Sequence, residues 1–551
     1  MRDERDHDSN SMVRPSQSVL PHADPNMYLS IYLVLAIRLA DTARILGVCP
    51  IPSYSHFVLS NRIFKELARR GHDVTVISAY SNDAPMDNFR EVLVTDALDK
   101  MKGLIAYSIL SRYNAVDFLA VAKTFYDQSD SNIISKVMWM DKITVEMSEF
   151  GLNNSNVTKF LREHGHFDVV ITHQLKTDSY YGFCHHFKAP CIALSPMSSI
   201  TWISGSIGNP APPSFVPQLV LGYTSVMNVW QRVHNTVIYA VVHLSYYLYS
   251  YPNHQDLLQK YFPGAPPLRE LYYNISLVLF NGHMSIGDVA PLLPNAIDIA
   301  GYHVYPPKAL PEDLRHFLDS ARDGVIYFSM GSNLKGADFS KEKKDAVLTA
   351  FSKLNHTVLW KWENGTIPGQ PKNVLVRPWF PQQDILAHPN VVLVVTHGGL
   401  LSTIESVYHG KPLLGLPVFA DQGLNMAMAQ EAGYGRYIQF QDLNVENFGS
   451  ELREMLYNPS YGRVAKMRSK IMHDQPLSPL EKSMYWIEYV LRHKGAPHLK
   501  SSAMTLNWYQ YLLWDGIFVG LGALLLVVVL IRMLSKVFWG LGDISMKKKR
   551  D

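Results

Sequence analysis

The sequence is poor in cysteine and has no strong excess of either charge. Only three of its 551 residues are cysteine, Cys49, Cys184 and Cys191, too few for a disulfide framework or a zinc site of paired cysteines. A Cys184–Cys191 bridge is conceivable, but cysteines in a core are commonly free thiols, and we expect two thiols here. The net charge of +3 is too small to indicate a nucleic acid or another polyanion as partner.

Common nucleotide and metal fingerprints are also missing. No G-x-G-x-x-G follows the first predicted strand, residues 45–50, and there is no Walker motif, which disfavours a dinucleotide cofactor. The one D-x-D pattern, Asp6 and Asp8, falls in a polar head, residues 1–26, that we expect to be disordered. The sequence therefore argues against a manganese-dependent transferase, and we expect neither a metal nor a resident cofactor.

A long apolar run lies near the C-terminus. Residues 512–534 are long enough to cross a bilayer, follow several Trp and Tyr residues, and precede Lys536 and a basic terminus. This pattern predicts one transmembrane helix with a cytosolic tail, residues 535–551, and the large body on the other side. Lys548 and Lys549 stand fourth and third from the end, which resembles the dilysine signal for return to the endoplasmic reticulum.

The N-terminal end predicts a cleaved leader and a lumenal body. Residues 27–43 carry a short apolar run followed by small residues, which is typical of a signal peptide. Because such peptides normally begin a chain, we expect either that Met27 is the true initiator or that the gene model is extended. Mild support for a lumenal body comes from five N-x-[ST] sequons, at Asn153, Asn156, Asn274, Asn355 and Asn364.

Between the two ends, strand and helix patterns alternate, which predicts an α/β protein with parallel sheets. A proline-rich linker, residues 291–314, separates an N-terminal domain, 44–290, from a C-terminal domain, 315–475, and residues 476–511 hold a return helix and a juxtamembrane segment. We expect two doubly wound, Rossmann-like domains facing a cleft. The predicted strands are 45–50, 73–78, 167–172, 189–194, 324–330, 358–362, 374–378, 391–396 and 413–417.

Two regions of the N-terminal domain are less regular. Residues 85–165 are read as largely helical and irregular. Residues 217–249 are rich in Val, Tyr and Leu with few charges, but too interrupted to predict a membrane span. Three interpretations stay open for the second region: a wall of an acceptor pocket, a pair of helices touching the membrane, or an element of the core.

Residues 379–430 carry the most specific pattern. The apolar run 391–396 leads into His-Gly-Gly and a helix-length segment, where bare backbone and a helix N-terminus favour a diphosphate. This stretch resembles the signature of the UDP-glycosyltransferases, called UDP-glucuronosyltransferases in vertebrates, and THGGLLSTIES resembles the arthropod branch more than the vertebrate one. The similarity extends through the P-x-x-S-H loop at 52–56 and the FDVV, FSMGS and SPLE segments to the tail, and it implies a GT-B fold.

The resemblance implies a site for the nucleoside and the sugar of a UDP-sugar. In this family pattern Trp379 stacks on uracil and Gln382 binds the uridine through its amide, which suits a flat, polar base. Glu405 takes the ribose hydroxyls. Asp421 and Gln422 recognise the hydroxyls of the sugar by hydrogen bonds.

The same resemblance implies diphosphate contacts from Ser332, His397, Gly399 and Ser402. One position departs from the pattern. Leu401 stands where vertebrate and plant members commonly carry Asn, so that one phosphate hydrogen bond is lost and Ser402 is the expected substitute.

On the acceptor side, the resemblance makes His56 the general base that deprotonates the attacking hydroxyl. Many relatives place an Asp or Glu after the FDVV strand to orient this histidine, whereas this chain has His173 there. Asp178 is the nearest carboxylate and is our candidate for the substitute. The alternatives are that Asp178 is only a helix cap, or that the enzyme is impaired.

Two functions stay open. The first is a single-pass enzyme of the endoplasmic reticulum membrane that moves glucose or glucuronic acid from a UDP-sugar to a hydroxyl of a small lipophilic acceptor, by an inverting direct displacement. The arthropod likeness favours glucose. The second is a catalytically weak homologue that binds UDP-sugar or forms homo- or hetero-oligomers with active relatives.

Overall fold

The computed structural model describes residues 42–94, 132–163, 165–199 and 201–547. The predicted head and the predicted signal peptide up to residue 41, including Asp6, Asp8 and Met27, therefore lie outside the described residues. The same holds for the dilysine pair, Lys548 and Lys549.

The N-terminal half is built on a seven-stranded parallel sheet with the strand order β3-β2-β1-β4-β5-β6-β7. Strands β4, β5 and β6 are buried along their whole length, as expected for parallel strands covered on both faces. The strands are β1 (Arg44–Cys49), β2 (Asp73–Ser78), β3 (Phe89–Leu93), β4 (Val169–His173), β5 (Cys191–Ser195), β6 (Ile275–Phe280) and β7 (Ala296–Asp298).

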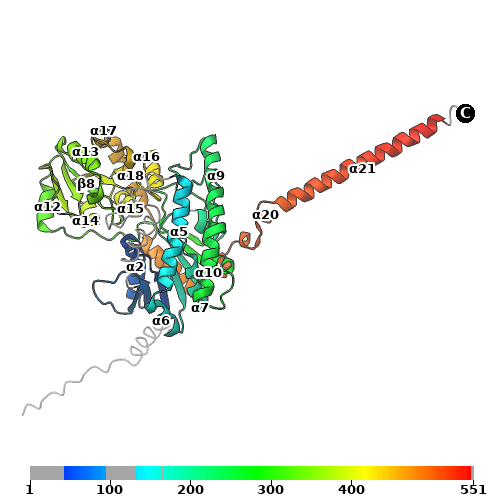
Figure 1. The fold of residues 1–551 in the computed structure, drawn as a ribbon, viewed down its shortest axis with the longest axis horizontal. Coiled ribbons are helices and arrows are strands. Elements are labelled where there is room, and N and C mark those ends of the chain that lie inside the picture. Colours follow the sequence, from blue (N-terminus) through cyan, green and yellow to red (C-terminus); the bar gives the residue numbers. More distant parts are fainter. Residues whose placement is uncertain (1–41, 95–131, 164, 200, 548–551) are drawn as a thin grey trace, which may run out of the picture. The chain divides into compact units, whose positions relative to one another are not determined.

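Helices connect these strands (Figure 1). They are α2 (Tyr54–Arg69), α5 (Ile133–Leu152), α6 (Ser155–Glu163), η2 (Asp178–Tyr180), α7 (Tyr181–His186), α8 (Thr201–Gly205), α9 (Val229–Ser245), the π-helical turn η3 (Tyr246–Ser250), α10 (Tyr251–Tyr261) and α11 (Leu268–Tyr272). Helices α5 and α9 contact each other along one side of this half. Asn228 starts α9 with a capping box shared with Gln231, and both of its hydrogen bonds are made.

The C-terminal half repeats the plan with a six-stranded parallel sheet of order β10-β9-β8-β11-β12-β13. Its strands are β8 (Val325–Ser329), β9 (Thr357–Lys361), β10 (Val374–Arg377), β11 (Val391–Thr396), β12 (Leu413–Gly415) and β13 (Gly435–Tyr437). Its helices are α12 (Glu312–Asp319), η4 (Gly336–Asp338), α13 (Lys341–Ser352), α14 (Gln382–Leu386), α15 (Leu400–Tyr408), α16 (Gln422–Glu431), η5 (Phe440–Asp442), α17 (Val445–Tyr457) and α18 (Pro459–His473).

The chain then returns to the N-terminal half through α19 (Pro479–Arg492). Ser478 caps this helix and Pro479 opens it, which fixes where it begins. Met484, Ile487 and Val490 of α19 pack into the core of the first sheet, and Arg70 of α2 pairs with Glu481 and Glu488. The segments that follow are η6 (Pro497–Leu499), η7 (Ser502–Thr505), α20 (Trp508–Tyr511) and α21 (Trp514–Lys547).

Helix α21 contains the candidate membrane span. Within the described residues, its stretch Trp514–Trp539 of 26 residues is the one helical stretch long and apolar enough to cross a bilayer. The sequence placed the span at 512–534. The helix begins two residues later, at Trp514, and stays apolar to Trp539.

The structure corrects three expectations about the fold. Strand β7 and the start of α12 lie inside the predicted linker, so the N-terminal sheet continues past residue 290. Strand β3 lies in the region read as helical and irregular. Cys184 and Cys191 form a disulfide instead of two thiols, because α7 and β5 bring their Cα atoms to 5.5 Å, while Cys49 is buried and free.

Residues 217–249 fit none of the three interpretations alone. Helix α9 buries Ile238 and Val242 against Val137 and Leu221, as a core element does. Its opposite face is apolar and exposed.

Candidate active site

The order of the strands defines where each half can bind a ligand. In the first sheet the chain runs outward from β1 to β3 and then restarts on the other side with β4, so that β1 and β4 flank the switch point. In the second sheet, β8 and β11 do the same. Ligands bind to such sheets outside the carboxyl ends of the strands at the switch point. The predicted residues His56 and His397 follow β1 and β11, respectively.

At the first switch point two histidines meet. His56 lies in the first turn of α2, and His173 is the last residue of β4. The Nδ1 atom of His56 and the Nε2 atom of His173 are 3.1 Å apart, so one ring donates a hydrogen bond to the other. His173 is buried, and its own Nδ1 atom has no hydrogen-bond partner among the described residues.

Both imidazoles are held in their neutral form. Burial lowers the pKa of His56 to about 4, and burial together with the neighbouring His56 lowers the pKa of His173 well below its ordinary value. Because both rings are neutral near pH 7, His56 has a lone pair for a proton. Its partner supplies no negative charge.

Asp178 is placed elsewhere, which corrects the expectation that it orients His56. It opens the short helix η2, and its Oδ2 atom accepts a hydrogen bond from the hydroxyl of Tyr246 at 2.7 Å. Burial raises the pKa of this carboxyl to about 6. Asp178 thus connects η2 to the π-helical turn after α9, and His173 is the residue beside His56.

The start of α2 contacts the loop after β8. Ser53 Oγ donates to Asn333 Oδ1 at 3.3 Å, although the two residues are 280 positions apart. The next residue, Tyr54, meets the edge of Trp379 with ring centroids 5.7 Å apart. These contacts bring the turn that carries His56 to the loop that carries Ser332.

In the second half, His397 lies in a cradle of glycines. A Cβ atom on Gly331 would come within 2.5 Å of its ring, and one on Gly399 within 2.4 Å. Gly331 has φ of +82°, a conformation that other residues rarely adopt. Burial, with a smaller effect of Lys361, lowers the pKa of His397 to about 4. The neutral ring is therefore packed between the turns after β8 and β11, where a diphosphate is expected.

The first turn of α15 is linked to the predicted uridine residues. Gln382 donates through Nε2 to Glu405 Oε2 at 2.5 Å and to Ser402 Oγ at 3.2 Å. Gln383, which the sequence did not single out, donates to the other oxygen of Glu405 at 3.0 Å, and His303 Nε2 lies 3.5 Å from it. The structure therefore brings together the amide and the carboxylate expected to hold uridine and ribose.

Trp379 presents an open aromatic ring. It is 57% exposed, an unusual state for so large an apolar group, and the ammonium of Lys361 lies 5.4 Å from the ring centroid. Lys361 also donates to the carbonyl of Gly331 at 3.0 Å and pairs with Glu363. One cation thus connects the ring of Trp379 to the glycine turn at His397.

Asp421 and Gln422 open α16. Asp421 accepts a hydrogen bond from Asn425, and Gln422 accepts from the backbone N–H of Val418 and of Phe419. Ala420 lies between strand β12 and Asp421, and its φ of +55° is strained for a residue with a Cβ atom. The loop that delivers Asp421 is therefore held in one shape by the amide of Gln422.

Leu401 has a packing role instead of a phosphate contact. It lies in the first turn of α15 and packs against the core cluster that contains Met484 and Ile487 of α19. An Asn at this position would have to desolvate its amide in that apolar contact. The departure from the family pattern therefore gives the two halves an additional hydrophobic contact.

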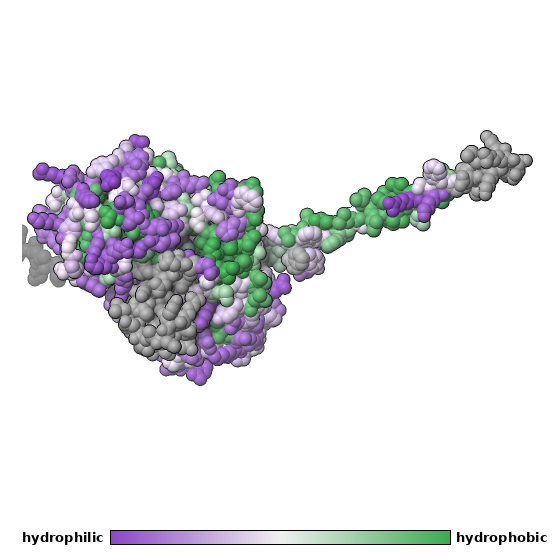
Figure 2. Space-filling model, turned by 45° about the horizontal axis from the view of Figure 1, so that its top comes forward, coloured by the Kyte–Doolittle hydropathy of each residue, from purple (hydrophilic) through white to green (hydrophobic). Residues whose placement is uncertain are grey.

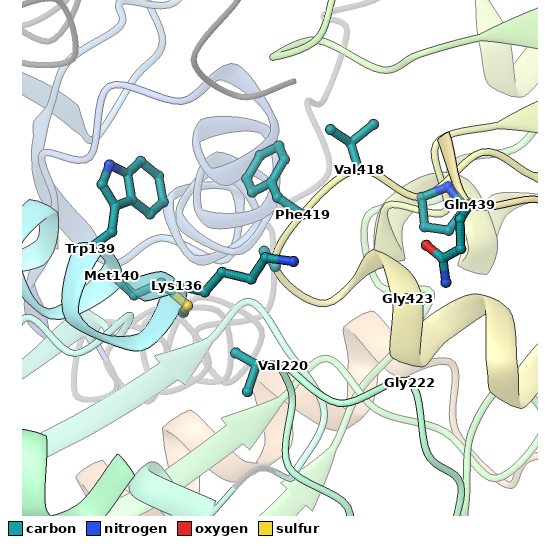
Figure 3. Close-up of a pocket in the computed structure, with 11 residues that line it drawn as sticks. Lys136, Trp139, Met140, Val220, Gly222, Val418, Phe419, Gly423 and Gln439 are labelled. Carbon is teal, nitrogen blue, oxygen red and sulfur yellow. The ribbon is translucent and has the colours of Figure 1, made fainter. Parts of the chain in front are cut away.

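Next to Asp421, a cavity of about 140 Å³ opens between the halves (Figure 3). Trp139 and Met140 of α5, with Val220, line it from the N-terminal half, and Phe419 and Gln439 line it from the C-terminal half. Val220 lies in residues 217–249, for which the wall of an acceptor pocket was one open interpretation. Trp139 and Met140 were not predicted, because α5 has no motif and its contact with residues 417–423 depends on the folded chain.

Comparisons with known proteins agree with this geometry. A family model described as UDP-glucuronosyl and UDP-glucosyl transferase matches residues 44–550. A UDP-glycosyltransferase (UGT5) of Dactylopius coccus is 34% identical over 509 residues, covering 92% of each chain. The mouse UDP-glucuronosyltransferase 2A2 is 29% identical over 515 residues, covering 90% of this chain and 94% of that one.

Solved structures show the same architecture. A UDP-glucose:anthocyanidin 3-O-glucosyltransferase in complex with UDP has 16% identity and a TM-score of 0.54, with 82% of this chain and 100% of that chain covered. The calicheamicin glycosyltransferase CalG4 gives a TM-score of 0.53 at 16% identity, with 82% and 99% covered. These similarities confirm the predicted GT-B fold of two Rossmann-like domains. Because the family model covers nearly the whole described chain, the protein belongs to the UDP-glucuronosyl and UDP-glucosyl transferase family.

Proposed function

We propose that this protein transfers a hexosyl group from a UDP-sugar to the hydroxyl of a small lipophilic acceptor, with inversion at the anomeric carbon. The observation that carries the proposal is the position of His56. It lies at the first switch point, and the residues that precede it contact the loop of Ser332 and the ring of Trp379. These contacts support a single site formed by His56 and the expected donor residues.

In the proposed reaction the acceptor hydroxyl loses its proton to Nε2 of His56. The oxygen then bonds to the anomeric carbon of the sugar while the bond from that carbon to the β-phosphate oxygen breaks, so that UDP leaves with the electron pair. An α-linked donor gives a β-glycoside. A general base of this kind contributes about 10²–10⁴-fold to such a rate.

This chemistry requires one tautomer of the histidine pair. His56 must carry its hydrogen on Nδ1 and donate it to His173 Nε2, because only then is the Nε2 lone pair of His56 free. His173 then carries its own hydrogen on Nδ1. His173 therefore acts as a neutral positioning residue in place of a carboxylate.

We propose that the protein itself stabilises the leaving UDP, without a metal. The first turn of α15, with Gly399 as its N-cap and Ser402 in that turn, offers backbone N–H groups and the positive end of the helix dipole. The neutral His397 lies beside it, and Ser332 follows Gly331.

Glucose is the sugar we favour over glucuronic acid. The relative named UDP-glucosyltransferase 2 of Dactylopius coccus is 33% identical over 495 residues, with 89% of this chain and 92% of that one covered. Asp421, where the sugar is expected, is a half-buried carboxyl whose pKa is raised by desolvation. A second carboxylate on the donor would meet it at a cost, whereas the neutral hydroxyls of glucose can donate hydrogen bonds to it.

We further propose that the body lies in the lumen of the endoplasmic reticulum, anchored by α21. The asparagines of all five sequons are exposed on the surface and therefore open to glycosylation. The Cys184–Cys191 disulfide is typical of an oxidising compartment. Digestion of the expressed protein with peptide N-glycosidase, with and without protease treatment of sealed microsomes, tests this topology.

The activity test uses microsomes that contain the full chain. Wild type and His56→Ala are compared with labelled UDP-glucose and UDP-glucuronate on a panel of phenols and steroids, with UDP binding measured in parallel. We expect glucosylation by the wild type, its loss in the variant, and equal UDP binding in both. Wild-type protein that binds UDP but converts no acceptor would refute the enzyme function.

The second candidate is a weak homologue that binds UDP-sugar and pairs with active relatives. The neutral character of His173 favours it, because the base then has no anionic partner to stabilise its protonated form. In the same assay this function predicts tight UDP binding with little turnover.

A further inference from the structure

Helix α9 and the turn η3 carry an exposed apolar stripe. Val229, Val233 and Val237 follow one another at intervals of four residues, and Leu244 and Tyr247 extend the same side. Val233, Val237 and Leu244 are 51%, 54% and 58% exposed. Hydrophobic side chains gather over this part of the body in the space-filling view (Figure 2).

The opposite side of α9 already has its partners. Asn235 accepts a hydrogen bond from the N–H of Gln218 and donates to the carbonyls of Pro213 and Val216, while Ile238 and Val242 pack on α5 and Leu221. A helix that is apolar on both sides is normally covered on both. The stripe is therefore a surface with a missing partner among the described residues.

The composition of the stripe suits a lipid surface. Helix α9 and η3 contain no Asp or Glu, and the charged side chain exposed among these residues is Arg232, which can face an anionic headgroup. Trp230, which is 81% exposed, and Tyr247 are residues that favour the membrane interface.

The juxtamembrane segment brings this stripe to the membrane. Met504 of η7 packs on Gly208, since a Cβ atom added to Gly208 would lie 2.8 Å from the sulfur of Met504. Farther along, Tyr511 of α20 lies near Tyr239 of α9 and contributes, after burial and Tyr247, to raising the pKa of that phenol. The apolar helix α21 begins three residues after Tyr511, at Trp514. The chain thus leaves for the bilayer from the side of α9.

We propose that the stripe of Val229, Val233, Val237, Leu244 and Tyr247 docks on the bilayer that α21 crosses. It holds the N-terminal half in the lipid interface by a second contact besides the span. The proposal does not depend on the proposed catalysis, since it concerns the surface of α9 and can be measured without substrates.

The test uses the full chain in lipid vesicles with one environment-sensitive fluorophore. Val237→Cys is labelled with a thiol-reactive nitrobenzoxadiazole dye, and labelling is selective because Cys49 is buried and the other two cysteines are bridged. Quenching is measured with nitroxides on the lipid acyl chains and with iodide in the water. Leu525→Cys on the exposed surface of α21 serves as the membrane reference, and Met467→Cys on α18 as the aqueous one.

We expect the label at position 237 to behave like that at 525, quenched by the lipid nitroxide and protected from iodide. A label at 237 that behaves like the one at 467 overturns the proposal. Protection from both quenchers also overturns it, because a second copy of the chain or residues 95–131 would then cover the stripe. Leu244→Cys repeats the measurement in case the variant at 237 does not fold.

Discussion

Replacement of His173 by Asp tests the proposed role of the histidine pair most directly. His56 accepts a proton only when it is unprotonated, so activity is lost as the pH falls through its pKa. In the wild type desolvation lowers that pKa to about 4. The neighbouring imidazole at 3.1 Å is neutral and does not raise it. An Asp would put a carboxylate in its place and stabilise the imidazolium.

The size of the effect follows from the short distance. Two opposite charges about 4 Å apart attract by about 4 kcal/mol at an effective dielectric constant of about 20, and such pairs shift a pKa by roughly 1–3 units. We therefore expect the acidic limb of kcat/KM to move from near pH 4 in the wild type to about pH 5–7 in His173→Asp. His173→Asn, which is polar and neutral, is the matched control and should leave the limb near its wild-type position.

The assay is glucosyl transfer by the full chain in microsomes between pH 3.5 and 9, a range set roughly by these pKa values, with UDP binding followed at each pH. If the limb does not move in His173→Asp while binding and folding persist, His56 is not the group that takes the proton. If the acidic limb moves equally in the Asp and Asn variants, the pKa of His56 responds to a change in its burial and not to the charge at position 173.

Three further predictions concern the donor site and the stability of the fold. Trp379→Ala should weaken UDP binding about 5–150-fold by calorimetry, since stacking on a base contributes about 1–3 kcal/mol, and Trp379→Phe should retain most of it. Gly399→Ala should abolish UDP binding with an unchanged circular dichroism spectrum, because the new Cβ atom would lie 2.4 Å from the imidazole of His397. The control is Gly462→Ala, since a Cβ atom at Gly462 would have no atom within 4 Å. Retained UDP binding in Gly399→Ala would contradict the packing of His397 between the glycines. Replacing Cys184 and Cys191 by Ala should lower the free energy of unfolding in urea titrations by about 2 kcal/mol, because the disulfide closes a short loop. An unchanged midpoint of urea unfolding would argue that the bridge does not form.

Much of the fold could be predicted from the sequence, because many strands are marked by local patterns of apolar and turn residues. Strands β2 and β11 match the predicted segments at both ends, since each is a short buried run bounded by turn residues. Strands β3, β6, β7 and β13 were missed. In β3 the apolar residues are interrupted by Arg90 and Glu91, which is the pattern of an edge strand, and β3 lies at the edge of its sheet, where it pairs with β2 alone.

The proximity of the expected donor residues was predictable for a related reason. Trp379, Gln382 and Glu405 lie within one continuous signature, so their spacing along the chain already reflects their spacing in the site. Gln383, which also donates to Glu405, was not predicted. It directly follows Gln382 and carries the same amide, so the adjacent pair of glutamines was the sequence feature that could have indicated it.

The sequence by itself determined the family, the two α/β halves and the segment expected to bind the donor. These depend on short-range periodicity and on motifs that are continuous along the chain. Only the tertiary structure decided the partner of His56. Residues 56 and 173 are 117 positions apart, and the parallel pairing of β1 with β4 places both at one switch point. The same holds for the Cys184–Cys191 bridge, the packing of Leu401 and the exposed side of α9, since burial and contact between distant segments exist only once both sheets have formed.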